Sequence, residues 1–163
     1  MLNADCEMID IRMATSAEDE VLVEHYLKIW DSYGTPPEHY RPDAAGWILS
    51  FIRSGREERC LTSFFAIVDG EIAGSVSCQL HQSPFPEIIR PEQRLLGYIW
   101  SVYVEDAFRR RGIALALTKK AVDHLKSLGC TTAVIHASDA GEPVYQAAGF
   151  ELAKEMRLKL AAD

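Results

Sequence analysis

The chain has 163 residues, of which 48% are hydrophobic, enough to build the core of one globular domain spanning residues 1–163. Its 17 Lys and Arg side chains are outnumbered by 24 Asp and Glu side chains, which gives a formal net charge of -7. An acidic chain does not attract nucleic acid or an anionic membrane surface as a whole. We therefore expect no nucleic-acid partner and no membrane partner, and any anion site has to be local.

We expect a cytoplasmic protein. The N-terminal stretch MLNADCEMID carries acidic residues and no apolar segment of the signal-peptide type, and no apolar run approaches the roughly 20 residues that span a bilayer. The cysteines show no close pair and no nearby histidine at metal-ligand spacing. We expect reduced, mostly buried thiols and no metal site; the cysteines are Cys6, Cys60, Cys78 and Cys130.

The first half of the chain is predicted to contain a strand, two helices and a hairpin. Residues 8–14 alternate apolar and polar side chains, as a half-buried strand does. Thr15 or Ser16 caps a helix that ends near residues 32–34, and a second helix begins at Pro42 and ends within residues 53–59. Asp69-Gly70 separates two β-rich runs and suits a tight hairpin turn.

The second half is predicted to be a loop followed by alternating strands and helices. Residues 81–94 are rich in proline and form the loop, and residues 95–104 (LLGYIWSVYV) form a strand covered on both faces. The remaining elements are a helix over 112–128, a strand over 130–137, a short helix over 138–149 and a closing strand over 150–160. The order β-α-α-β-β-β-α-β-α-β predicts an α/β (α+β) domain with a mixed, mostly antiparallel sheet flanked by helices.

The junction between the long strand and the next helix, EDAFRRRGIA, predicts an anion site. A helix N-terminus at a strand end offers unpaired N–H groups and positive potential, and phosphate is its natural ligand. Gly112 and Ala114 keep this turn small. The spacing fits neither the P-loop nor the dinucleotide fingerprint. The three arginines are unfavourable beside a positive helix end unless an anion is bound; a solvated helix start or a nucleic-acid contact is the alternative.

Two motifs resemble the GNAT N-acetyltransferase superfamily. VYVEDAFRRRGIA (residues 102–114) is similar to its motif A, [QR]xxGx[GA], matched by Arg109, Gly112 and Ala114. VYQAAGFE (residues 144–151) is similar to the end of its motif B, with a tyrosine four residues before Gly-Phe. The element order extends this resemblance over nearly the whole chain.

The resemblance implies acetyl-CoA as cosubstrate, an amine acceptor and no metal. Main-chain N–H groups of residues 110–115 would hold the pyrophosphate, and the backbone of residues 102–104 would pair with the pantetheine arm. In this family the fourth strand is splayed from the fifth, and we place the accompanying β-bulge at Trp100-Ser101. The expected cofactor-binding residues are Val102, Tyr103, Val104, Arg109, Arg110, Arg111, Gly112, Ile113, Ala114, Leu115 and Ser138.

The resemblance also suggests catalytic residues. Tyr145 would give a proton to the CoA thiolate, because a phenol is protonated at neutral pH; a packing role on the short helix is the alternative. Ser138 stands where the family often has Asn, and its hydroxyl either caps the helix or touches CoA. Glu105, Asp106 and His136 are candidates for the base that deprotonates the amine; a hydrogen-bonded structural role is the alternative for His136, and a solvated loop acid is the alternative for Glu105.

The acceptor itself is not identified by the sequence. The aromatic residues that flank the GTPPEH loop could hold a cationic amine together with Glu38 and Asp43, or simply pack the helices; they are Trp30, Tyr33, Tyr40 and Trp47. Residues 81–94 lead into the strand that carries the site. Sheet-edge dimers are common in the superfamily, which leaves a homodimer open. The alternative function is a non-catalytic acyl-CoA-binding sensor.

Overall fold

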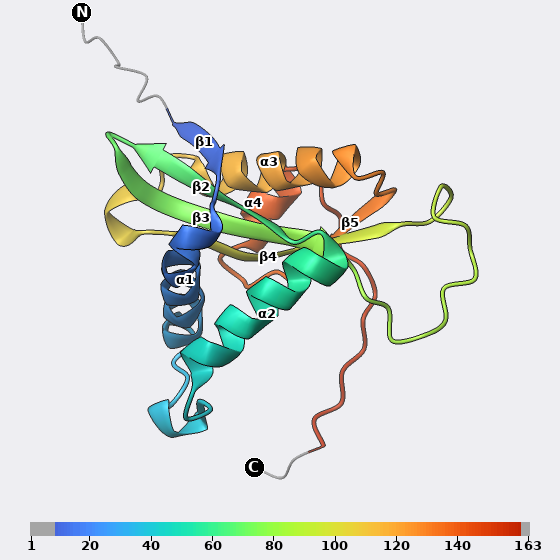
Figure 1. Cartoon of the computed structure of the whole chain (residues 1–163), viewed down its shortest axis with the longest axis horizontal. Helices are drawn as coiled ribbons and strands as arrows, with labels where there is room; N and C mark the ends of the chain where they lie inside the picture. Colours follow the sequence, from blue (N-terminus) through green and yellow to red (C-terminus); the bar gives the residue numbers. More distant parts are fainter. Residues whose placement is uncertain (1–8, 161–163) are drawn as a thin grey trace, which may run out of the picture.

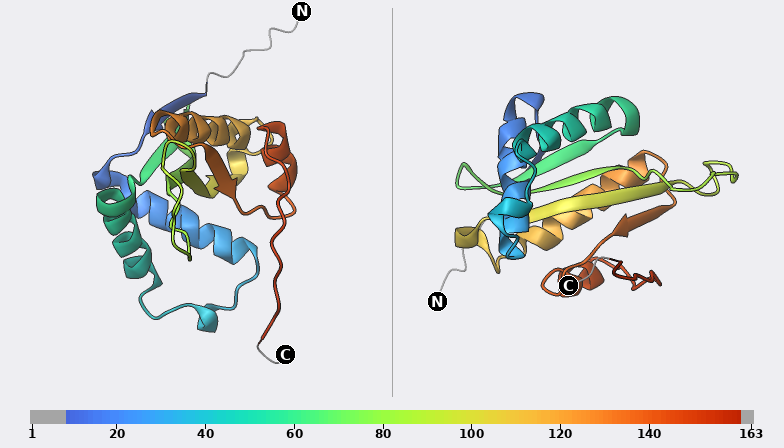
Figure 2. Two further views of the ribbon diagram at one scale, coloured as in Figure 1. Left: turned by 90° about the vertical axis from the view of Figure 1, so that its right-hand side faces the viewer. Right: turned by 90° about the horizontal axis from the view of Figure 1, so that it is seen from below.

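The computed structural model describes residues 9–160, so the predictions for Cys6 and Met8 lie outside the described residues. Five strands form one sheet in the order β1-β2-β3-β4-β5, with α1 and α2 on one face and α3 on the other (Figures 1 and 2). The helices and strands are β1 (Asp10–Met13), α1 (Asp19–Ser32), α2 (Ala44–Arg59), β2 (Thr62–Val68), β3 (Glu71–Leu80), β4 (Leu96–Val104), α3 (Ile113–Ser127), β5 (Thr132–Ile135) and α4 (Glu142–Ala147).

Local capping signals set the beginnings of the first two helices. Thr15 and Glu18 form a capping box around a short 3-10 turn (Ser16–Glu18), and α1 follows directly. The carboxylate of Asp43 accepts a hydrogen bond from the Gly46 N–H at 3.1 Å, so α2 begins at Ala44, slightly later than the predicted start at Pro42. Both predicted helices are confirmed.

The sheet separates two apolar cores because successive side chains of a strand point to opposite faces. Phe64 of β2 belongs to the core beneath α3, where it meets Val76, Ile99 and Leu117. The next residue, Phe65, belongs to the core beneath α1 and α2. The core beneath α3 is built from apolar side chains, and the buried hydroxyl of Thr118 donates to the Ala114 carbonyl of its own helix, whereas the other face of β3 carries a row of buried polar side chains.

Strands β4 and β5 part halfway along β4. Their parallel pairing runs from Leu96↔Thr132 to Ile99↔Ile135, and beyond it the two strands diverge (Figure 2). On its other edge β4 pairs with β3, but Ser75↔Tyr103 and Ser77↔Trp100 leave one extra residue in β4. Ser101 takes a left-handed conformation there (φ 55°). This is a β-bulge at the place predicted for it, and we call the opening between the two strands the fork.

The predicted closing strand is wrong. Residues 150–160 belong to no helix or strand, and their alternating apolar side chains, such as Met156 (97%) and Leu160 (88%), are exposed. A cavity of about 630 Å³ is lined on one side by β5 and on another by residues 149–153. Alternation predicts a strand only where a neighbouring edge accepts its backbone hydrogen bonds, and here the segment does not reach the four-residue edge of β5.

The remaining elements of the predicted order are confirmed, and so is the fold class. Of the described cysteines, Cys78 is buried, Cys130 is half-buried and Cys60 is exposed, and none forms a disulfide. Within residues 9–160, none of the helices has both the length and the apolar character that a membrane crossing requires.

Helix α3 approaches β4 closely at Gly97, and this contact is testable. A Cβ atom added to Gly97 would lie 2.6 Å from the Leu125 side chain, which is 1% exposed. We expect Gly97→Ala to lower the free energy of unfolding by about 1–3 kcal/mol through overpacking. In a Leu125→Ala background the same change should cost at least about 1 kcal/mol less, because the clash is gone. Equal costs in both backgrounds, measured by urea unfolding, would contradict this packing.

Candidate active site

The loop between β4 and α3 turns the chain through two left-handed residues. A 3-10 turn (Asp106–Phe108) follows β4, and then Arg110 (φ 64°) and Gly112 (φ 77°) direct the chain into α3. A Cβ atom added to Gly112 would meet no atom within 4 Å. The backbone conformation, and not lack of space, is therefore what favours glycine here, and the space above this residue is open to a ligand.

The first turn of α3 presents unpaired amides. The Ala116 N–H donates to the Gly112 carbonyl at 3.0 Å, which is the start of the helical hydrogen-bond ladder. The amides of Ile113, Ala114 and Leu115 come before this ladder and have no carbonyl one turn back to which they can donate. Together with the positive end of the helix dipole they are suited to an anion at the place where β4 ends, and the predicted pyrophosphate contact stays a prediction.

The arginine side chains are partly used to hold this loop. The Arg109 Nε–H donates to the Val104 carbonyl at 3.1 Å, and the same guanidinium lies 2.7 Å from the Asp106 carboxylate. Arg111 donates to the Ala107 carbonyl at 3.2 Å and covers the Phe108 ring. These contacts favour the backbone amides over the arginine side chains as the principal anion-binding groups.

The predicted pantetheine-binding segment lies along the fork. Val102, Tyr103 and Val104 follow the last β4–β5 pair at Ile99, so their backbone edge on the β5 side is outside the ladder. The structure thus brings this open edge and the N-terminus of α3 to the same end of the sheet. The Val104 carbonyl on this edge already has a partner, because the Arg109 Nε–H donates to it.

Tyr145 lies half-buried on α4, with its ring 6.3 Å from that of Phe150. Burial, with a smaller effect of Tyr33, raises the pKa of Tyr145 to about 12. The phenol therefore keeps its proton at neutral pH, as a general acid must. Tyr33 follows the last residue of α1.

Ser138 caps the turn that leads into α4, whose N-cap residue is Gly141. Its Oγ accepts a hydrogen bond from the Gly141 N–H at 3.2 Å, and its carbonyl accepts from the N–H groups of Gly141 and Glu142. Of the two roles open to this hydroxyl, the structure supplies direct contacts for capping. A contact with CoA stays a prediction.

Glu105 is anchored by three side chains at the end of β4. Its carboxylate lies 2.8 Å from Lys28 Nζ, 3.2 Å from His25 Nε2 and 3.3 Å from the Tyr103 hydroxyl. Burial alone would raise the pKa of Glu105, but the hydrogen bond and charge of Lys28, with His25 and Tyr103, outweigh it and lower the pKa. Such a carboxylate is a weak proton acceptor at neutral pH.

His136 lies where β5 leaves β4, between a phenol and a carboxylate. Its Nδ1 contacts the Tyr98 hydroxyl, and its Nε2 lies 3.1 Å from Glu155 Oε2. Burial raises the pKa of Tyr98, so this phenol is protonated and donates to Nδ1, while the Nε2–H donates to Glu155. The predicted base is therefore part of a chain of hydrogen bonds. Asp106, the other predicted base, pairs with Arg109.

The aromatic residues predicted near the acceptor divide into two groups. Trp30 and Tyr33 lie edge to face at 5.8 Å at the end of α1. Tyr40 donates to the Asp31 carboxylate at 2.8 Å, and Trp47 is covered by the chain's own cation Arg41 at 4.0 Å. The latter pair thus already has partners within the protein.

Two aromatic residues on β4 were missed by the sequence reasoning. Tyr98 and Trp100 lie on the face of the sheet opposite to Ile99, toward α2. The signal was available, since period-two alternation in LLGYIWSVYV places these rings on one face. Within the described part of the chain, no group of three or more His, Cys, Asp and Glu side chains is placed to hold a metal.

Comparison with known proteins identifies the class. Residues 22–150 match the model of the Acetyltransferase (GNAT) family, and the chain belongs to this family. Membership supports acyl-CoA-dependent acetyl transfer as the general activity, in agreement with the anion site and the fork. Among curated proteins none matches the chain.

Solved structures share the fold over almost the whole chain. A GCN5-related N-acetyltransferase from Ralstonia eutropha is 23% identical with a TM-score of 0.77, covering 95% of this chain and 100% of its own. A predicted acetyltransferase from Clostridium acetobutylicum, solved with acetyl-CoA, is 23% identical with a TM-score of 0.79 (94% and 97% covered). An aminoglycoside antibiotic 6'-N-acetyltransferase from Acinetobacter haemolyticus is 18% identical with a TM-score of 0.66 (94% and 99% covered).

The buried His25 predicts a pH dependence of stability. Its side chain is 2% exposed and lies 2.8 Å from Ser75 Oγ, and burial lowers its pKa. Protonation of the ring is therefore less favourable in the folded protein than in the unfolded chain, whose histidine takes up a proton below its ordinary pKa of about 6.5. The unfolded state then binds more protons, so the free energy of unfolding falls as the pH drops below about 6.5, by at most about 1.4 kcal/mol per pH unit.

Urea unfolding at several pH values between about 7.5 and 5.5 measures this slope. His25→Gln should flatten it, and His39→Gln, which changes an exposed histidine, should leave it as in the wild type. A slope that is unaffected by His25→Gln would show that the ring is protonated equally in both states.

Proposed function

We propose that the protein transfers the acetyl group of acetyl-CoA to a primary amine by direct attack in a ternary complex. The observation that carries this proposal is the alignment of two features at one end of the sheet. The amides of the first turn of α3 suit the pyrophosphate, and the open backbone edge of Val102–Val104 suits the pantetheine arm. One extended cosubstrate lying along the fork would use both.

The chemistry follows from this placement. The amine nitrogen attacks the thioester carbon, and a tetrahedral intermediate forms with the charge on the carbonyl oxygen. As the intermediate collapses, the C–S bond breaks and the sulfur leaves with the electron pair of that bond. Tyr145, protonated because its pKa is raised to about 12, gives its proton to the sulfur, so that CoA departs as a thiol.

The amine has to lose a proton, and His136 is favoured over Glu105 for this task. Glu105 has a lowered pKa and three partners, which makes it a structural anchor for α1. In the chain Tyr98–His136–Glu155, the Tyr98 oxygen accepts the amine proton while the phenol proton moves to His136 Nδ1. Glu155 stabilises the resulting imidazolium through Nε2.

The names of the structural neighbours agree with this proposal. One of them was solved with acetyl-CoA, and another acts on aminoglycoside antibiotics, which are amines. At 23% and 18% identity they support the fold and the donor more than the acceptor. The direct test is a thiol-release assay with acetyl-CoA and a panel of polyamines, aminoglycosides, amino acids and short peptides. Release with one class would establish transfer, whereas acetyl-CoA binding without release from any amine would favour the sensor function.

Gly112 tests the phosphate site. We expect Gly112→Glu to weaken CoA binding more than about tenfold, because a carboxylate would lie among the amides that receive the phosphates. Gly112→Ala is the matched control: an added Cβ meets no atom, so this variant bears only the cost of the left-handed conformation. Calorimetry that gives both variants the wild-type affinity would place the phosphates elsewhere.

Tyr145 tests the proton donor. Tyr145→Phe keeps the ring that packs near Phe150 and removes only the hydroxyl. We expect kcat for the best amine to fall by about 100-fold, with little change in the affinity for acetyl-CoA. Tyr40→Phe is the matched control: it removes a hydroxyl that donates to Asp31, and we expect kcat to stay near the wild-type value. If the chemical step limits kcat and Tyr145→Phe leaves kcat unchanged, Tyr145 is not the proton donor.

A further inference from the structure

Four buried side-chain atoms of the described residues have no hydrogen-bond partner, and they come from one region of the molecule. They are Arg59 Nε, Gln79 Oε1, His81 Nδ1 and Trp100 Nε1. Arg59 is the last residue of α2, and Trp100 lies on β4 at the fork. Gln79 is the second-last residue of β3, and His81 follows that strand directly. We call this group the polar patch.

The sheet register brings three members of the polar patch together. Gln79 lies directly opposite Tyr98, and Trp100 lies two residues further along the same strand on the same face. His81 is on this face too, two residues beyond Gln79, with its ring 5.6 Å from the Tyr98 ring. Gln79 is 7% exposed, so its unpaired oxygen is held inside the protein.

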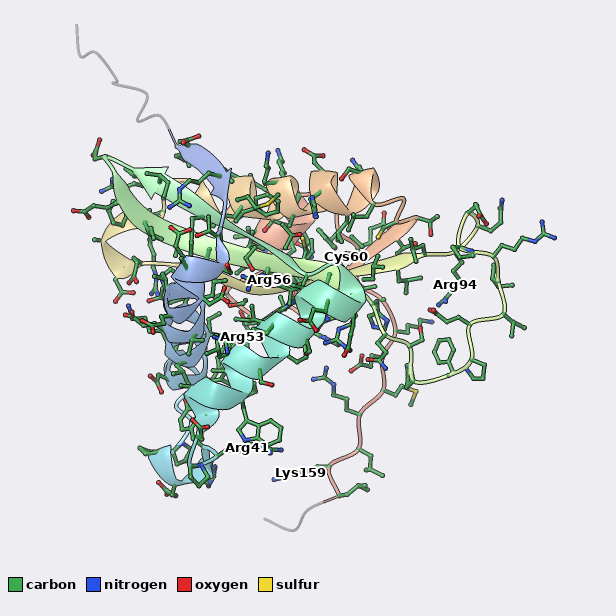
Figure 3. The ribbon with its side chains drawn as sticks, viewed as in Figure 1. Arg41, Arg53, Arg56, Cys60, Arg94 and Lys159 are labelled. Atoms are coloured by element: carbon green, nitrogen blue, oxygen red, sulfur yellow. The ribbon has the colours of Figure 1, made fainter. Side chains whose placement is uncertain are left out.

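Helix α2 brings the fourth member. The Arg59 guanidinium lies 5.2 Å from the centre of the Phe51 ring, and the Trp100 ring meets the same Phe51 ring at 5.4 Å. Arg59 Nη1 lies 3.5 Å from Gln82 Oε1, just beyond β3. In Figure 3 the label of Cys60, the residue after Arg59, marks where this end of α2 reaches the sheet.

The unpaired state is specific to this part of the sheet. On the same face of β3, Ser75 pairs with His25 at 2.8 Å and Ser77 pairs with Ser63 at 2.7 Å. The next residue in this row, Gln79, has an unpaired oxygen. A buried polar atom without a partner costs free energy, so this group, which runs from Trp100 at the fork to His81 beside the paired half of β4, indicates that a ligand supplies the partners.

The atoms define the chemistry of that ligand. Arg59 Nε–H and Trp100 Nε1–H can only donate, and the guanidinium is positively charged, which favours an anionic acceptor such as a carboxylate. Gln79 Oε1 accepts, and therefore suits an N–H or O–H group of the same ligand. Glu58 Oε2, 3.4 Å from Arg59 Nη1, is on an exposed side chain and leaves Nε unpaired.

We propose that the polar patch binds the carboxylate of the acceptor, so that the acceptor is an amine that also carries a carboxylate, such as an amino acid. This inference rests on the proposed acetyl transfer, because it takes the fork as the place of the thioester. Trp100 is the first residue of β4 beyond the last β5 pair, so a carboxylate held there places the amine of the same small molecule beside the fork.

Binding in the presence of CoA tests the patch without turnover. Wild-type protein saturated with CoA is titrated calorimetrically with amino acids and with the amines that lack only the carboxylate. We expect at least one amino acid to bind tenfold or more tightly than its decarboxylated counterpart. Arg59→Gln should abolish this difference, and Trp100→Phe should reduce it while retaining the ring contact with Phe51.

Arg53→Gln is the matched control, since Arg53 is an exposed arginine of the same helix (Figure 3). The Arg53→Gln variant should still bind the amino acid more tightly than the amine that lacks the carboxylate. This result would show that loss of one positive charge on α2 does not by itself abolish carboxylate recognition. Thermal unfolding of each variant checks that it is folded. No preference for the carboxylate in the wild type, or the same loss in Arg53→Gln and Arg59→Gln, would overturn the inference.

The proposed function is judged by a different measurement. Carboxylate-dependent binding without thiol release from acetyl-CoA would contradict acetyl transfer and leave the polar patch supported. Thiol release that is equally efficient with amino acids and with their decarboxylated counterparts, and equally affected by Arg59→Gln, would support acetyl transfer and refute the patch as a carboxylate site.

Discussion

The separation of β4 from β5 is the feature on which the rest of the site depends. A continuous ladder between them would occupy the backbone edge of Val102–Val104 and leave no room for an extended cosubstrate. The bulge at Ser101 interrupts the regular pairing of β4 with β3, which resumes at Tyr103, and the parallel ladder with β5 ends at Ile99. The close contact of Gly97 with Leu125 holds α3 against the paired half, so that its N-terminus reaches the open end.

The electrostatics of this end explain how a chain of net charge -7 can receive a polyanion. Unpaired amides and the helix dipole act over a few ångströms, whereas distant acidic residues are screened beyond about 10 Å in salt. The nearest acid of the strand end, Glu105, is neutralised by Lys28 at 2.8 Å. An anion can therefore bind here without a basic protein surface. Arg109 instead stabilises the loop by donating a hydrogen bond to the Val104 carbonyl.

Sequence reasoning succeeded where the signal is local and failed where it is not. The hairpin at Asp69-Gly70 and the helix after Gly112 follow from a few adjacent residues, and the bulge at Ser101 follows from the family pattern. The closing strand failed because alternation in residues 150–160 carries no information about whether β5 is within reach. Lys28 and Glu105 are 77 residues apart in the sequence, and no local sequence pattern predicts their contact.

The two faces of the sheet also decide from which side an acceptor can approach. Beneath α3 the core consists of apolar side chains, including Ile99 at the base of the fork, and a polar amine would lose its hydration there without compensation. On the opposite face the row of β3 is polar, and its hydrogen bonds are complete at Ser75 and Ser77 but incomplete at Gln79. The acceptor therefore has one favourable approach, from the side of α1 and α2, toward the half of that row which the protein leaves unpaired.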